Sequence, residues 1–116
     1  AQAVQDAAET LHENFVKRAF QTDSICQLAT ASPHPVLVCG DFNSLPSSYT
    51  YHRFSESLKD GFKTGGHGYM YTYRYGKRML RIDYAFHSPE LECTDYYSPN
   101  LDLCSDHNPV IFTVKY

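Results

Sequence analysis

The chain has 116 residues and a formal charge of −3, from 10 Lys and Arg against 13 Asp and Glu, with 42% hydrophobic and 20% charged residues. This length suits one domain, and the globular composition excludes disordered, collagen-like and coiled-coil classes. The small negative charge argues against passive nucleic-acid binding through a basic surface, and no run of 18 apolar residues is present to span a membrane. A phosphate-handling enzyme that uses bound cations remains compatible with these values.

Residues 1–31 have the pattern of one long amphipathic helix. Apolar side chains recur at helical spacing, with polar and charged residues between them, at Val4, Ala8, Leu11, Phe15, Ala19, Ile25 and Leu28. Neither Pro nor Gly interrupts this pattern before Pro33, and Pro35 follows, so we expect the helix to end near Ala31.

A short apolar run at residues 35–39 comes next. Its length and β-branched content predict a strand that is buried on both faces. Gly40 ends the run, and residues 41–46 form a turn-rich loop at the carboxyl end of the strand.

The sequence after this loop predicts a short helix followed by a second loop. The serines at 47–48 are N-cap candidates for a helix over residues 51–58, with Phe54 and Leu58 directed inward. We then expect a loop that contains Gly61, Gly65, Gly66 and Gly68.

The rest of the chain has the pattern of several strands. Residues 69–75 and 79–86 flank a turn at 76–77 and predict a hairpin, and further strands are predicted at 92–97 and 110–114. This order predicts an α/β domain with a mixed, mostly antiparallel sheet that the long amino-terminal helix covers on one face.

The four cysteines are Cys26, Cys39, Cys93 and Cys104, and none has the spacing of a zinc site. They could form two disulfides in an oxidising compartment. Because Cys39 lies inside an apolar strand, we favour a buried free thiol at that position.

Three motifs place an acid or a base at the end of an apolar strand: GDFN at residues 40–43, RIDY at 81–84 and SDHNP at 105–109. Each has a purely structural interpretation. The first could be a turn that hydrogen-bonds its own backbone, the second a salt bridge between Asp83 and Arg81 or Arg78, and the third a loop or helix cap. Their coincidence in one short chain favours a functional site.

The residue types in these motifs suit water attack on a phosphorus centre. One carboxylate can support the imidazolium form of a histidine, a second can hold a divalent cation and a third can deprotonate water. Asp41, Asp83, Asp106 and His107 supply such a set. Carboxylate and water ligands suit Mg²⁺ or Mn²⁺, which would neutralise the developing charge together with the histidine.

GDFN, RIDY and SDHNPV, in this order and each at a strand end, resemble the endonuclease/exonuclease/phosphatase superfamily. Its members include DNase I-like nucleases, abasic-site endonucleases and inositol-polyphosphate 5-phosphatases. The resemblance covers nearly the whole chain, because the helix ahead of GDFN also fits the family's layout. It implies a four-layer α/β sandwich, of which residues 1–116 look like the carboxyl-terminal half.

The resemblance also implies a role for each site residue. Asp41 would position or deprotonate the attacking water, and Asn43 would bind the scissile phosphate or help to place a metal. Asp83 would orient His107 through a hydrogen bond, and His107 would stabilise the phosphate oxyanion. Asp106 would help to ligate Mg²⁺ or Mn²⁺.

This chain departs from the family pattern in what precedes the long helix. The family's first half supplies a strand-end Asn and a metal-binding Glu, and nothing here matches them. We therefore expect the chain alone to hydrolyse phosphoesters poorly or not at all. The sheet face that would meet the missing amino-terminal half should be apolar and exposed, so that the chain pairs with that half or self-associates.

Several alternatives stay open. The substrate could be a nucleic acid, a phospholipid headgroup or a soluble phosphoester. A non-catalytic binding or interaction module that kept the fold is one rival, and a metal-independent α/β domain with accidental motifs is another.

Other aromatic residues also form patterns of interest. Tyr69, Tyr71, Tyr73 and Tyr75 would share one strand face, either as a stacking platform for bases or sugars or, as we favour, packed on the sheet. We expect the remaining histidines at the surface or in loops, namely His12, His34, His52, His67 and His87.

Overall fold

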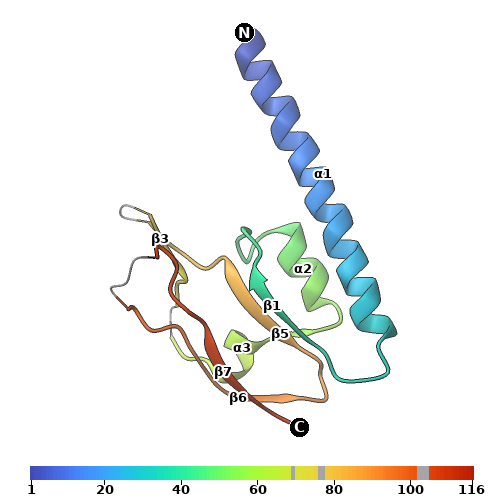
Figure 1. Ribbon diagram of the computed structural model, residues 1–116, viewed down its shortest axis with the longest axis vertical. Helices are drawn as coiled ribbons and strands as arrows, with labels where there is room; N and C mark the ends of the chain where they lie inside the picture. Colours follow the sequence, from blue (N-terminus) through green and yellow to red (C-terminus); the bar gives the residue numbers. More distant parts are fainter. Residues whose placement is uncertain (69, 76–77, 102–104) are drawn as a thin grey trace.

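The computed structural model describes residues 1–68, 70–75, 78–101 and 105–116. Its elements are α1 (Gln2–Ala31), β1 (Leu37–Asp41), α2 (Tyr49–Ser55), β2 (Lys59–Asp60), α3 (Gly61–Gly65), β3 (Tyr73–Tyr75), β4 (Arg78–Leu80), β5 (Asp83–His87), β6 (Glu92–Tyr97) and β7 (Ile111–Lys115). Within these ranges the strands form three antiparallel groups, ordered β1-β5-β2, β3-β4 and β6-β7 (Figure 1). No helix in the described ranges is both long and apolar enough to cross a membrane.

β5 lies at the centre of the fold, because its side chains alternate between two buried clusters. Tyr84 and Phe86 belong to one cluster and Ala85 to the other. The first cluster joins β5 to α1 and α2 through Cys26, Tyr51, Phe54 and Leu58. The second joins it to β6 through Cys93 and Tyr96, with Phe112 and Val114 of β7 packed against them.

Only the last turns of α1 cover the sheet, whereas we expected the whole helix to do so. Thr22 and Cys26 are its buried residues, and most of the predicted apolar stripe is exposed, as in Leu11 at 67%. A helix of 30 residues is about 45 Å long, far longer than the five-residue β1, so it extends past the sheet (Figure 1). The buried face also runs through Thr22 and Cys26 rather than the predicted Ile25 and Leu28.

The prediction that β1 is buried on both faces is wrong. β1 is an edge strand with β5 as its one neighbour in its sheet, and of its residues only Val38 packs against a core cluster. Cys39 is therefore exposed rather than buried, while Cys26 and Cys93 are buried free thiols. Cys104 lies outside the described residues.

The predicted hairpin is shorter than expected. Its second strand divides into β4 and β5, which belong to different sheets. Residues 76–77 at its turn, and Tyr69 at its start, lie outside the described residues. The predicted glycine loop contains the short helix α3, which begins where Asp60 accepts a hydrogen bond from the Phe62 N–H at 3.0 Å.

The predicted strands β6 and β7 and the presence of α2 are confirmed, although α2 begins two residues earlier and ends three residues earlier than the predicted 51–58. Ser48 caps α2 by accepting the Tyr51 N–H, and Phe54 and Leu58 are buried as expected. β6 has the predicted bounds, and β7 begins one residue later than predicted. His87, which we expected at the surface, is instead buried in the central strand, where its Nε2 lies 2.9 Å from Thr64 Oγ1.

A buried ion pair connects the segment between β4 and β5 to β2 and α2. Arg81 Nη1 lies 2.8 Å from Asp60 Oδ2, and the two side chains are 8% and 2% exposed. The Tyr51 hydroxyl donates to the same carboxylate oxygen at 2.7 Å. These contacts pair the buried charges of Arg81 and Asp60, each of which would be unfavourable to bury without a partner.

We expect Asp60→Ala to destabilise the fold by about 3–5 kcal/mol, because it leaves the Arg81 guanidinium buried without its partner. Chemical denaturation followed by circular dichroism measures this change. The matched control is Asp23→Ala, since Asp23 pairs with Arg53 at 3.1 Å on the surface and should contribute about 1 kcal/mol or less. Equal effects of the two substitutions would contradict this account of the buried pair.

Candidate active site

The register between β1 and β5 brings two of the predicted acids together. Asp41 ends β1, Asp83 begins β5, and the two residues are direct antiparallel partners. Partners in an antiparallel pair share one face of the sheet, so the two carboxylates project side by side. Like charges in this arrangement repel, and a cation between them is favourable.

The His107 ring lies beside both carboxylates and would be cationic when protonated. Its Nδ1 lies 2.8 Å from Asp83 Oδ2, and its Nε2 lies 3.7 Å from Asp41 Oδ2. One ligand atom from each of these three residues lies within 4.8 Å of the other two. The structure thus brings Asp41, Asp83 and His107 together from three separate motifs.

The surroundings of His107 raise its pKa. The hydrogen bond that its Nδ1–H donates to Asp83 is the largest cause, and the negative charges of Asp83, Asp41 and Asp106 act in the same direction, whereas partial burial opposes them. Asp83 therefore favours the imidazolium form and holds the Nδ1 proton. This arrangement leaves Nε2 as the nitrogen that faces the exposed Asp41.

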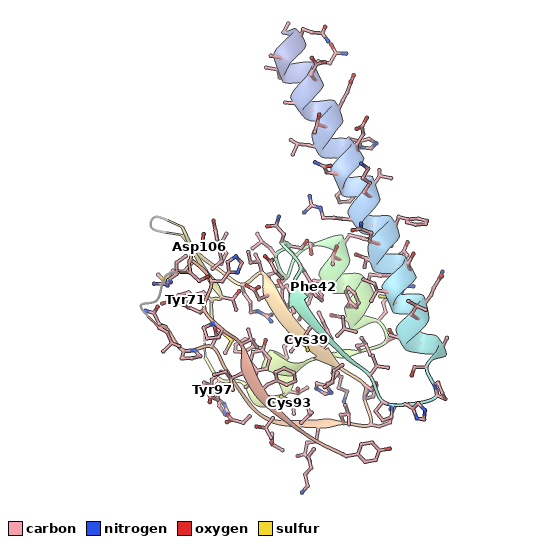
Figure 2. The ribbon with its side chains drawn as sticks, viewed as in Figure 1. Cys39, Phe42, Tyr71, Cys93, Tyr97 and Asp106 are labelled. Atoms are coloured by element: carbon pink, nitrogen blue, oxygen red, sulfur yellow. The ribbon has the colours of Figure 1, made fainter. Side chains whose placement is uncertain are left out.

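The GDFN motif is held by Phe42, which lies between its two polar neighbours. The Phe42 ring points toward α2 (Figure 2), and its centroid lies 5.1 Å from that of Phe54 and 5.4 Å from that of Tyr84. Its N–H donates to the Ile82 carbonyl at 2.9 Å. The core thus fixes the backbone on either side of Asp41.

Asn43 lies beside Asp41 through a backbone contact. The Asn43 N–H donates to Asp41 Oδ1 at 2.8 Å, and Asn43 has a positive φ of 48°, a conformation that Asn adopts more readily than most residues. One carboxylate oxygen of Asp41 therefore makes the turn hydrogen bond that the purely structural interpretation expected. The second oxygen, Oδ2, is the one that faces His107.

The carboxylate of Asp106 does not belong to the three-residue group. Asp106 is exposed, and its backbone carbonyl accepts the Arg74 N–H at 2.9 Å. It lies at the end of the molecule that carries β3 (Figure 2). Its charge nevertheless contributes to the raised pKa of His107.

The structure changes the interpretation of Arg81 and of the alternating tyrosines. Arg81 pairs with Asp60, so the suggested salt bridge between Arg81 and Asp83 is wrong. Tyr73 packs on the histidine itself, with ring centroids of Tyr73 and His107 5.0 Å apart. The alternating tyrosines gave no signal for this contact, because it joins residues 34 positions apart (107 − 73).

Two hollows flank Asp41. The first, of about 390 Å³, lies between α1 and β1 and also involves Asn43. The second, of about 260 Å³, lies between the β1–β5 pair and the start of β7, and Asp83 and Phe112 line it. The acids are thus reachable from the surface.

Comparison with known proteins agrees with this geometry. Residues 11–107 match the profile of the Endonuclease/Exonuclease/phosphatase family. The chain belongs to this family. A comparison with curated proteins gives no match.

Several solved structures share the fold. An endonuclease/exonuclease/phosphatase from Bacteroides vulgatus is 25% identical, with a TM-score of 0.74 over 84% of this chain and 43% of that one. A mannosyl-6-phosphatase from Bacteroides thetaiotaomicron is 23% identical, with a TM-score of 0.60 over 84% and 44% of the two chains. A functionally unknown conserved protein from Enterococcus faecalis is 20% identical, with a TM-score of 0.69 over the same shares.

The chain spans less than half the length of these structures. The likeness confirms the predicted fold class, an α/β architecture of antiparallel sheets and helices that forms part of a larger sandwich. The roles of the individual site residues stay predictions.

We expect Asp83→Asn to lower the pKa of His107 toward its ordinary value of about 6.5, because the substitution removes the largest cause of the increase. Titration of the histidine ring resonances by NMR measures this pKa. Asp95→Asn, an exposed change in β6, is the control and should leave it unchanged.

The same substitution should change how stability depends on pH. Since the folded pKa of His107 is raised, the stabilisation from its protonated form is complete below about pH 6.5 and is lost as the pH rises through the folded pKa. Asp83→Asn should flatten this dependence in denaturation experiments. An unchanged titration of His107 in the variant would show that Asp83 does not hold its proton.

Proposed function

We propose that this chain is the carboxyl-terminal part of a metal-dependent phosphoesterase that hydrolyses phosphodiester or phosphomonoester bonds. The observation that carries the proposal is the convergence of Asp41, Asp83 and His107 at adjoining strand ends. Membership of the Endonuclease/Exonuclease/phosphatase family supports it. The similar fold of a mannosyl-6-phosphatase is consistent with phosphoester chemistry.

In this proposal His107 stabilises negative charge on the phosphate. In the imidazolium form, which Asp83 favours, Nδ1–H donates to Asp83 and Nε2–H is left to donate to an anionic oxygen of the phosphate. The separation of 3.7 Å between Nε2 and Asp41 Oδ2 is too long for a hydrogen bond and leaves this donor available. The donor is thus oriented before the substrate binds, which favours transition-state stabilisation.

Asp41 is the proposed base for the attacking water. Its Oδ1 is fixed by the Asn43 N–H, and its Oδ2 is directed toward the histidine. The side chain is 49% exposed, so water reaches it. Asn43 follows directly, and we propose that its amide contacts the scissile phosphate.

The acids also fit a divalent cation such as Mg²⁺ or Mn²⁺. These hard ions prefer carboxylate oxygens and water, and the exposed carboxylate of Asp106 directly precedes His107 in the chain. We propose that Asp106 would help to hold the ion, since Asp83 is engaged with His107 and Asp41 is the proposed base. When bound, such an ion neutralises charge on the phosphoryl oxygens.

We expect His107→Ala to lower phosphoester hydrolysis by about 10²–10⁴-fold in the longer protein to which this chain would belong. The probes are bis(p-nitrophenyl) phosphate, a diester, and p-nitrophenyl phosphate, a monoester, each assayed with Mg²⁺ and with Mn²⁺. The ratio of the two rates identifies the bond that the protein cleaves.

His52→Ala is the matched control, because His52 is an exposed histidine of α2 and should have no effect on the rate. Chelation with EDTA should remove the activity, and added Mg²⁺ or Mn²⁺ should restore it. A wild type that hydrolyses neither probe would instead favour a non-catalytic module that kept the fold, and equal measurable rates for the wild type and His107→Ala would contradict the role given to the histidine.

We further propose that the chain needs the other half of the sandwich. It matches 43% to 44% of the length of the solved structures, and apolar side chains such as Leu37 and Ile111 are 45% and 42% exposed. The hollow beside Phe112 has further apolar lining from Ala85 and Val110. An amino-terminal half that packs here would bury these groups.

The isolated 116-residue chain should therefore show little or no hydrolysis and should self-associate as its concentration rises. Light scattering measures the association, and the two nitrophenyl probes measure the activity. A monomer at all concentrations with metal-dependent turnover would show that the chain is sufficient.

A further inference from the structure

Thr72 lies at the junction of the RIDY and SDHNP segments and is fully buried, at 0% exposure. Its side-chain oxygen accepts two backbone hydrogen bonds, from the Ile82 N–H at 3.1 Å and from the Asp83 N–H at 3.0 Å. The Asp83 amide begins β5 and the Ile82 amide directly precedes it, and Thr72 satisfies both of them. One hydroxyl thus fixes the backbone from which the Asp83 carboxylate projects.

The backbone of Thr72 contacts the other segment. The Thr72 carbonyl accepts the N–H of Asn108, the residue that follows His107, at 2.6 Å. The Thr72 N–H donates to the Leu80 carbonyl at 2.9 Å. The next residue, Tyr73, forms a bridge with His107 and packs against its ring. Thr72 is therefore bonded both to Asp83 and to the residue that follows His107.

We propose that Thr72 is a positioning residue that holds Asp83 and His107 in register. Its side chain fixes one partner and its backbone fixes the neighbour of the other, so the 2.8 Å contact between Asp83 Oδ2 and His107 Nδ1 depends on it. Thr72 acts on the geometry of the Asp83–His107 pair, and the effect of that geometry on catalysis rests on the proposed function.

The physical reason lies in the two amides. Ile82 is 7% exposed, so an N–H that lost its acceptor there would have little access to water. A buried amide without a partner is unfavourable, and the start of β5 would shift to find another acceptor. A shift of about 1 Å is enough to misplace a catalytic pair.

Three variants separate the hydroxyl from the shape of the side chain. Thr72→Val keeps the shape and removes the acceptor, whereas Thr72→Ser keeps the acceptor and removes the methyl group. Thr72→Ala removes both, so a comparison of Ala with Ser isolates the hydroxyl if Val does not fold. Thr113→Val, at an exposed position of β7, is the control.

The first measurement is NMR of the ¹⁵N-labelled chain. Thr72→Val should speed amide exchange at Ile82 and Asp83 by at least about 10-fold, and it should weaken or remove the downfield Nδ1–H signal of His107. Exchange in β6 should stay the same, and Thr72→Ser should keep both signatures. If the His107 signal persists in the Val and Ala variants, the positioning role is wrong.

The second measurement is hydrolysis by the longer protein. Thr72→Val should lower kcat by roughly 10- to 100-fold with KM changed by less than about 2-fold, and Thr72→Ser should restore most of the rate. A changed NMR signature in a protein whose wild type is inactive would retain the positioning role and overturn the proposed function. An unchanged signature would overturn the positioning role whatever the rate.

Discussion

The candidate site depends on one constraint, the register of β1 against β5. That register sets Asp41 opposite Asp83, and it is fixed because Val38 and Phe42 must both face the aromatic cluster. A slip of one residue would turn every side chain of β1 to the other face and separate the acids. The repulsion between two adjacent carboxylates is the cost of this register, and a protonated His107 offsets it.

The parts of the fold that the sequence predicted are those set by local patterns. Ser48 and the apolar spacing of Phe54 were enough to locate α2, and alternation was enough to locate β6. The three motifs pointed to Asp41, Asp83 and His107, which the structure brings together, and to Asp106, whose carboxylate it leaves outside that group. Strand register decides which of these side chains come into contact, and a local sequence pattern does not reveal the register.

The errors have a common physical cause, since burial depends on the position of a strand within its sheet. Cys39 was expected inside and His87 outside, yet β1 is an edge strand and β5 a central one. The carboxylate of Asp60 and the hydroxyl of Thr72 gave no signal either. Their partners Arg81 and Asp83 lie 21 and 11 residues away along the chain, and such pairings follow from the fold.

The GDFN and RIDY motifs each alternate a residue of the site with a residue of the core. Phe42 is packed among aromatic rings between Asp41 and Asn43, and Tyr84 is buried directly after Asp83. The acids therefore have no hinge of their own, because a local opening that moved them would also expose the aromatic cluster. The two acids are therefore held by the same contacts that stabilise the domain, and any adaptation to substrate has to come from the loops around them.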